Sequence, residues 1–155
     1  MDLQLQWTVE NLLARYVHAI DDGQLEAWPE FFTDHGRYKV VTAENHERGL
    51  PLALIDADSR AMLRDRVSSL RNANVYERHR YRHVVSSTLV TAEATSALAV
   101  SCFQVTRIMH TGESMTFATG RYVDRIRVDG ARALFEEKLV ILDSRAIDTL
   151  LAIPL

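Results

Sequence analysis

The sequence predicts a single α+β domain over residues 1–155, in which N-terminal helices pack on a curved antiparallel or mixed sheet. Before residue 72, apolar residues recur at the three- and four-residue spacing of amphipathic helices. After residue 80 the chain reads as long strands joined by tight turns. Helices followed by a meander of strands are typical of α+β folds, and 155 residues suffice for one core.

The first half is predicted to be mainly helical. Thr8 is placed to cap the first helix, and the Asp-Asp-Gly stretch at 21–23 is expected to end it. Pro29 suits the first turn of a short helix or a kink. We expect helices over residues 9–20 and 58–72, a shorter helical segment around 25–32, a strand over 37–42, and between 43 and 54 a loop with room for a short strand.

The second half is predicted to be an antiparallel meander. Asp129-Gly130 is a strong hairpin signal, and the run from His110 to Glu113 reads as another tight turn. A sheet bent around helices makes a cone with a pocket at its open end. The apolar end of the chain, residues 148–155, either packs back on its own domain or fills a groove on a neighbour. We expect strands over residues 80–90, 96–110, 114–128 and 132–143.

Composition narrows the class of protein. The net charge of -3 gives no excess of positive charge with which to bind a polyanion, so no nucleic-acid partner is expected. Cys102 is the single cysteine, which excludes a disulfide framework and favours a cytoplasmic location. The first residues lack the features of a signal peptide, and no apolar run is long enough to span a membrane.

Arginine is the most unusual component of this chain. It outnumbers lysine sixteen to two, and seven arginines fall between Asp58 and His83. A guanidinium can be desolvated against carboxylates and aromatic rings, which an ammonium tolerates poorly. The cluster therefore predicts either a surface that meets another protein or a set of solvated charges.

The sequence offers few residues with the types and spacing that metal sites require. Zinc and iron–sulfur sites need several Cys or His residues at fixed spacing. His79 and His83, with Glu77 as a carboxylate, would offer a two-histidine iron site. The favoured interpretation is that both histidines are hydrogen-bonded surface or interface residues, and that the chain holds no metal.

A cofactor-free acid–base pocket is the alternative for the chemistry of this chain. Tyr16 and Asp21 lie near the end of the first helix, and His83 and His110 lie on or beside strands. Inside a cone capped by helices, these four could converge. Such residues suffice for proton abstraction beside a carbonyl or for dehydration. They would make the protein a stand-alone isomerase or dehydratase, and a third possibility is a small-ligand binding module without chemistry.

Several motifs resemble one known family. They are WPEFFT at 28–33, DRV at 65–67, NVYERHRYRH at 74–83, RIMHTGE at 107–113 and the DTLLAIPL run at 148–155. Together they make the chain similar to the small (β) subunit of aromatic-ring-hydroxylating dioxygenases, whose fold is the nuclear transport factor 2-like cone. The resemblance spans the whole chain.

The resemblance implies a non-catalytic subunit of an oxidoreductase. The large (α) subunit of such enzymes carries a Rieske [2Fe–2S] centre and a mononuclear Fe(II), receives electrons from NAD(P)H through a reductase, and cis-dihydroxylates an aromatic carboxylate such as terephthalate. The small subunit carries no cofactor, forms a self-trimer and scaffolds an α3β3 assembly. The resemblance places subunit contacts at Arg66, Tyr76, Arg78, Arg80, Arg82, His83, Leu150 and Leu151. Phthalate isomers, other benzoates and anthranilate remain alternative substrates.

Overall fold

In a computed structural model, four helices and six strands are formed by the described residues, which are 1–72, 77–144 and 151–155. The helices are α1 (Leu3–Asp21), the 3-10 helix η1 (Leu25–Phe31), α2 (Ala43–Glu47) and α3 (Arg60–Asn72). The strands are β1 (Phe32–Thr42), β2 (Ile55–Ala57), β3 (His79–Ala92), β4 (Ser96–Met109), β5 (Ser114–Asp129) and β6 (Arg132–Leu142). None of the helices is long and apolar enough to cross a membrane.

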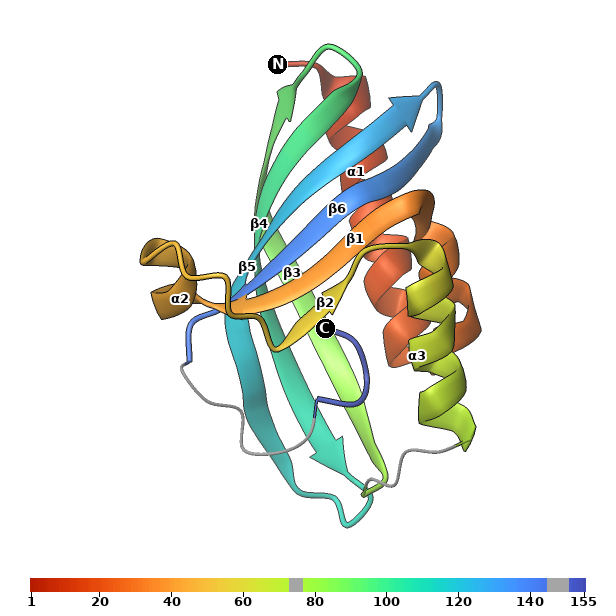
Figure 1. The fold of residues 1–155 in the computed structure, drawn as a ribbon, viewed down its shortest axis with the longest axis vertical. Helices are drawn as coiled ribbons and strands as arrows, with labels where there is room; N and C mark the ends of the chain where they lie inside the picture. Colours follow the sequence, from red (N-terminus) through yellow and green to blue (C-terminus); the bar gives the residue numbers. More distant parts are fainter. Residues whose placement is uncertain (73–76, 145–150) are drawn as a thin grey trace.

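One strongly curved sheet organises the molecule, in the order β2-β1-β6-β5-β4-β3. The strands from β3 to β6 form the expected antiparallel meander. The first strand, β1, adds to it in parallel beside β6, and β2 closes that edge in antiparallel pairing. Figure 1 shows α1 and α3 on one side of the sheet, which curves past them. The predicted α+β cone is therefore confirmed.

Local signals explain where the element boundaries differ from expectation. The first helix begins earlier because Asp2, rather than Thr8, is its N-cap and accepts a hydrogen bond from the backbone N–H of Leu5 at 3.0 Å. The expected loop after residue 42 begins with helix α2, because the Thr42 hydroxyl accepts from the backbone N–H of Asn45 at 3.2 Å. Strand β1 begins at Phe32 rather than residue 37, with an irregularity before Arg37.

Large aromatic side chains fill the space between the helices and the sheet. Trp28 packs edge-on against Tyr38 with ring centroids 5.0 Å apart, and Tyr16 packs edge-on against Phe135 at 5.3 Å. Such pairs add about 0.5–1.5 kcal/mol beyond the area they bury. Leu155 is fully buried among the same core residues. Of the two expectations for the apolar C-terminal segment, packing on its own domain is thus confirmed for residues 151–155, while residues 148–150 lie outside the described part.

Strands β5 and β6 approach each other closely at Gly120. A Cβ atom at this position would lie 1.9 Å from the backbone oxygen of Ile141 on β6. We therefore expect Gly120→Ala to lower the free energy of unfolding by about 3 kcal/mol or more, the upper range for overpacked sites. Urea unfolding followed by circular dichroism would measure this loss.

Arg121→Ala on the neighbouring exposed position of β5 serves as the control and should change stability by less than about 0.5 kcal/mol. Equal stability of the two variants would contradict the close approach of β5 and β6.

Candidate functional site

The interior of the cone contains a buried ion pair. Lys138 on β6 donates from Nζ to Oδ2 of Asp124 on β5 at 3.1 Å, and both side chains are fully buried. The two residues are direct cross-strand partners, and Tyr38 of β1 lies opposite Lys138 on its other side. Aromatic faces surround the ammonium, with Nζ 3.5 Å from the ring centroid of Tyr122, 4.6 Å from Phe135 and 4.7 Å from Tyr16.

Desolvation dominates the titration of this pair. Burial raises the pKa of Asp124 to about 6, against the attraction of the Lys138 ammonium, and burial lowers the pKa of Lys138 despite the nearby carboxylate. Burial likewise raises the pKa of the Tyr16 and Tyr122 hydroxyls well above the ordinary value. Both tyrosines are therefore neutral hydrogen-bonding groups at physiological pH.

Two phenols of the interior converge on one backbone oxygen. Tyr16 and Tyr38 each donate a hydrogen bond from the side-chain hydroxyl to the backbone oxygen of Leu155, at 2.9 and 3.1 Å. The Tyr38 hydroxyl also accepts from the Leu155 N–H at 3.0 Å, and the Tyr16 hydroxyl accepts from Nε1 of Trp28 at 3.1 Å. The C-terminal segment thus occupies the centre of the cone.

A second buried pair joins the end of α1 to β3. Asp21 accepts from the backbone N–H of His83 at 2.8 Å with Oδ2, and its Oδ1 lies 2.6 Å from His83 Nδ1. The His83 ring is fully buried, and its Nε2 has no hydrogen-bond partner among the described residues. This contact uses both oxygens of Asp21, which leaves that carboxylate committed to β3.

The four residues of the alternative acid–base site are only partly brought together. Asp21 and His83 are in contact, and Tyr16 lies in the cone interior bonded to Trp28 and Leu155. His110 is half exposed at the β4–β5 turn, with Nδ1 3.5 Å from a carboxylate oxygen of Glu77. The expectation that all four converge is thus wrong for His110, because the hairpin carries it out of the interior.

The charged pair of the interior was not predicted from the sequence. The signal was present, because strand side chains alternate between faces and Asp124 lies between the inward-facing Tyr122 and Ile126. Lys138 similarly precedes the inward-facing Val140 at the same alternation. A lysine and an aspartate on the apolar phase of neighbouring strands could have indicated a buried pair.

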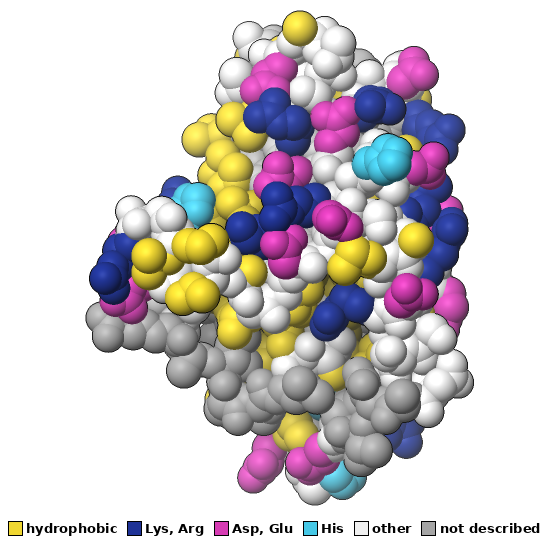
Figure 2. Space-filling model, in the orientation of Figure 1, with side chains coloured by type: hydrophobic (Ala, Val, Ile, Leu, Met, Phe, Trp, Pro, Cys, Tyr) yellow, Lys and Arg dark blue, Asp and Glu magenta, His cyan; other side chains and the backbone are white. Residues whose placement is uncertain are grey.

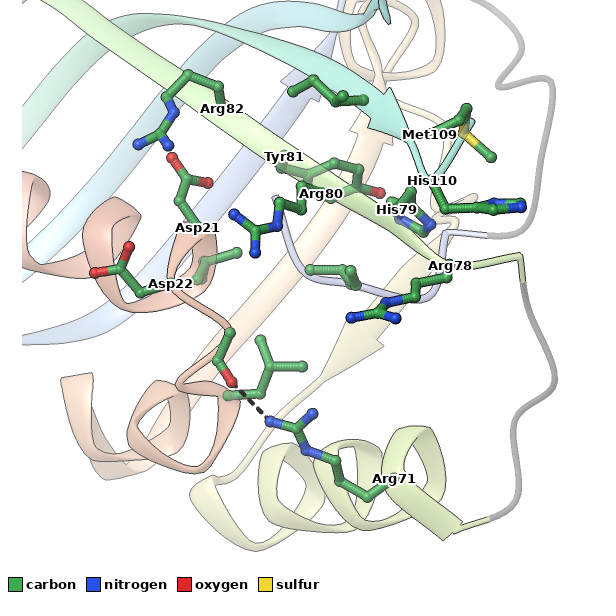
Figure 3. A pocket seen from close by; sticks show the side chains of 15 residues that line it. Asp21, Asp22, Arg71, Arg78, His79, Arg80, Tyr81, Arg82, Met109 and His110 are labelled. Carbon is green, nitrogen blue, oxygen red and sulfur yellow. Dashed lines mark hydrogen bonds between the residues drawn. The ribbon is translucent and has the colours of Figure 1, made fainter. Parts of the chain in front are cut away.

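A cleft of about 850 Å³ opens where α1 ends, β3 begins and β4 ends. Figure 3 shows Arg80 and Arg82 of β3, and Arg78 directly before that strand, projecting to the side where α1 ends. They share this side because every second residue of an extended chain faces the same way. Arg71 of α3 lies on the opposite wall, where it donates to the backbone oxygen of Gly23 at 2.7 Å.

These three guanidiniums differ from most others in the chain. In the described residues, Arg78, Arg80 and Arg82 are exposed and make no ion pair. Elsewhere arginines pair with carboxylates of the same chain: Arg37 with Asp56, Arg48 with Glu44, Arg60 with Asp34, Arg64 with Glu30, Arg71 with Glu26, Arg125 with Glu93 and Arg127 with Glu136. Figure 2 shows such intermingled charges on the face that carries β1 and β6.

The remaining contact residues suggested by the sequence are dispersed. Arg66 is exposed on α3, beside a smaller hollow of about 380 Å³ that Ala152 also lines. Leu151 is partly buried against the core, and His83 is fully buried rather than exposed. Tyr76 and Leu150 lie outside the described residues.

The surface also carries an apolar patch. Leu50, Leu52 and Leu54 are exposed in the connection from α2 to β2, with Leu52 60% exposed. Figure 2 shows hydrophobic side chains gathered in this region beside α2. Exposed apolar groups of this kind often mark a contact with another protein.

Residues suited to hold a metal do not cluster in the described part of the chain. No group of three or more His, Cys, Asp or Glu could bind an ion there. His79, His83 and Glu77 do not form such a group, and the Nδ1 atoms of the two histidines are engaged by the Glu77 backbone oxygen and by Asp21. The described residues therefore provide no set of ligands for a mononuclear iron or an iron–sulfur cluster.

Comparison with known proteins gives consistent matches. Residues 15–149 match the family model described as the ring hydroxylating beta subunit. The chain is 43% identical to subunit beta 1 of the terminal oxygenase component of terephthalate 1,2-dioxygenase from Comamonas sp., over 92% of this chain and 93% of that one. It is 37% identical to the small subunit of anthranilate 1,2-dioxygenase from Burkholderia cepacia, over 99% and 96%.

A solved structure matches closely as well. It is the crystal structure of a β subunit assigned to an aromatic-ring-hydroxylating dioxygenase from Novosphingobium aromaticivorans. The TM-score is 0.89 with 35% sequence identity, covering 97% of each chain. The nuclear transport factor 2-like cone expected from the sequence is thereby confirmed.

The buried ion pair predicts unequal effects of single and double substitution. Lys138→Met leaves the Asp124 carboxylate buried without its counter-charge, so the free energy of unfolding should fall by about 3–5 kcal/mol at pH 7.5. Asp124→Leu combined with Lys138→Met should recover most of this loss, because neither charge then remains. Urea unfolding of the single and double variants would measure both effects.

The loss caused by Lys138→Met should also depend on pH. The pKa of Asp124 is higher in the folded protein than in the unfolded chain. The free energy of unfolding therefore falls as the pH rises from the ordinary pKa of an aspartate to the folded-state pKa of Asp124. For the unsubstituted protein this fall ends at about pH 6. Without the ammonium the Asp124 pKa rises further, so the gap between the two proteins should widen above pH 6. A gap that is constant between pH 5 and pH 7.5 would contradict a charged pair.

Proposed function

This chain belongs to the family of ring-hydroxylating dioxygenase β subunits, and from that premise we propose that it is the non-catalytic scaffold of such an enzyme. The observation that carries the proposal is the cleft bearing Arg78, Arg80 and Arg82, three exposed guanidiniums that form no ion pair in the described chain although Asp21 and Asp22 line the same cleft. We propose one domain over residues 1–155 whose work is to hold a large subunit in place. The described residues supply a rigid core and a charged surface for that role.

The iron chemistry is proposed to reside on the large subunit. A Rieske [2Fe–2S] centre and a mononuclear Fe(II) there would activate O2 with electrons from NAD(P)H. In support, this chain has one cysteine and its described residues form no metal-binding group. The contribution of this chain is positional and involves no step of the reaction.

The proposed substrate class is an aromatic carboxylate. The similar subunits from Comamonas and Burkholderia belong to dioxygenases of terephthalate and anthranilate, both of which are aromatic carboxylates. The greater identity to the terephthalate enzyme favours terephthalate. The dihydroxylation itself would take place on the partner subunit, and assembly in the cytoplasm fits a chain with a lone cysteine.

We assign the large-subunit contact to the cleft bearing Arg78, Arg80 and Arg82. An acidic segment of the large subunit would neutralise three guanidiniums that project to one side of β3. Guanidinium–carboxylate contacts buried at an interface carry much of its specificity and of its association rate. An α3β3 assembly built on a self-trimer is the proposed stoichiometry, and the leucines at 50, 52 and 54 offer an apolar surface for a further contact.

Removing the unpaired guanidiniums should weaken assembly without unfolding the domain. The triple variant Arg78→Ala, Arg80→Ala and Arg82→Ala should lose roughly 30-fold or more in affinity for the large subunit, as expected when several interfacial charges are truncated. The single variant Arg82→Ala should show a smaller loss. Co-purification with a tagged large subunit and size-exclusion chromatography would measure assembly, and thermal unfolding would measure stability.

Arg121→Ala is the matched control, because Arg121 is also exposed and makes no ion pair in the described chain but lies outside the cleft. It should leave assembly intact. Full assembly of the triple variant, or metal-independent turnover of a small molecule by the isolated chain, would defeat the scaffold assignment.

A further inference from the structure

The cleft where α1 ends combines its arginines with apolar side chains. Leu25 of η1 and Ile20 of α1 line it and are only 2% and 3% exposed. Ile108 of β4 and Ile153 near the C-terminus also line it and are partly buried. These four residues are called the apolar lining below. A partner that paired only with the arginines would leave this lining in water and forgo the free energy of burying it.

The arginines set a spacing that a partner must match. Arg78, Arg80 and Arg82 follow one another at every second residue (Figure 3). An extended chain advances about 3.3 Å per residue, so these side chains leave the backbone roughly 7 Å apart. A partner segment that is also extended repeats its own side chains at the same distance. Carboxylates on its alternate residues then meet all three guanidiniums, while the residues between them face the other way.

The wall opposite β3 is preformed, because Arg71 of α3 ties it together. Its guanidinium donates to the backbone oxygen of Gly23 at 2.7 Å, and its Nε donates to a carboxylate oxygen of Glu26 at 2.8 Å. These bonds fasten α3 to the connection between α1 and η1. A partner therefore meets a cleft whose two sides are already in place, which lowers the entropy lost on binding.

Two carboxylates of the cleft restrict how an acidic partner can lie in it. Both oxygens of Asp21 contact His83, whereas Asp22 is exposed at the end of α1. Because like charges repel, the carboxylates of a partner must turn toward β3 and away from Asp22. The uncharged residues of an extended partner then turn toward α1 and η1, where Ile20 and Leu25 lie.

We infer, on the basis of the proposed function, that the cleft receives an extended segment of the large subunit with acidic residues at alternate positions and one large apolar residue between two of them. The carboxylates pair with Arg78, Arg80 and Arg82, and the large apolar side chain, the anchor, packs on the apolar lining. The cleft of about 850 Å³ has room for such a side chain and its neighbours. Charge then speeds and orients the encounter, and burial of the anchor slows dissociation.

A blocked pentapeptide of sequence EFEAE is the probe for this arrangement. The peptide EAEAE lacks the anchor, and the peptide QFQAQ lacks the charges. The full chain should bind EFEAE at least about tenfold more tightly than either of them, because each lacks one of the two contributions. Raising the salt concentration from 0.1 M to 0.5 M should remove most of the preference over QFQAQ and keep the preference over EAEAE. Isothermal titration calorimetry would measure the affinities.

Ile108→Ala removes part of the apolar lining and should cancel most of the preference for EFEAE over EAEAE. Leu98→Ala is the matched control, because Leu98 is also a partly buried residue of β4 but lies outside the cleft. It should keep the full preference. In co-purification with a tagged large subunit, EFEAE should compete with the large subunit for this chain, and EAEAE should compete at least about tenfold less well. Thermal unfolding would show whether each variant is folded.

Equal affinity of the unsubstituted chain for EFEAE and EAEAE would overturn the inference, whether or not Ile108→Ala folds. An unchanged preference in folded Ile108→Ala would overturn it as well, and so would failure of EFEAE to compete. The scaffold proposal would survive each of these results if the triple arginine variant still lost the large subunit. If that variant instead lost only its self-association, the cleft would be a contact between copies of this chain, and the inference would be wrong.

Discussion

The ion pair between Lys138 and Asp124 constrains how β5, β6 and β1 pair with one another. It joins direct partners on β6 and β5, and Tyr38 of β1 lies opposite Lys138 on the other side. A slip of either strand by one residue would move a charge to the opposite face of the sheet, so the pair allows only one register. That register then places the rings of Tyr16 from α1, Tyr122 from β5 and Phe135 from β6 around the ammonium.

Most helices and strands could be predicted from local sequence patterns. The features that could not be predicted depend on pairing between residues far apart in the chain. The meander from β3 to β6 could be predicted because each of its strands meets its neighbour through a short turn. The parallel pairing of β1 with β6 could not, since just over a hundred residues separate Phe32 from Phe135 and no short turn joins the two strands. Lys138 was missed as an interior residue because a lone lysine on a strand is usually exposed.

The candidate site, too, could be predicted only in part. Arg78, Arg80 and Arg82 could be assigned to one face from the alternation of a strand, and the structure places them along one cleft. That His83 engages both oxygens of Asp21 could not be predicted, because the two residues lie 62 positions apart in the sequence.

The parallel contact between β1 and β6 also determines when the domain can form during synthesis. Strand β1 belongs to the first third of the chain, yet its partner is the last strand, and Tyr38 of β1 then contacts Leu155. Nascent β1 and the apolar side of α1 must therefore remain without their final neighbours until nearly all of the polypeptide has left the ribosome. Contacts that span most of a chain slow folding and leave apolar surface open to aggregation in the meantime. Translation of this subunit close to a companion able to shield that surface would shorten the vulnerable interval.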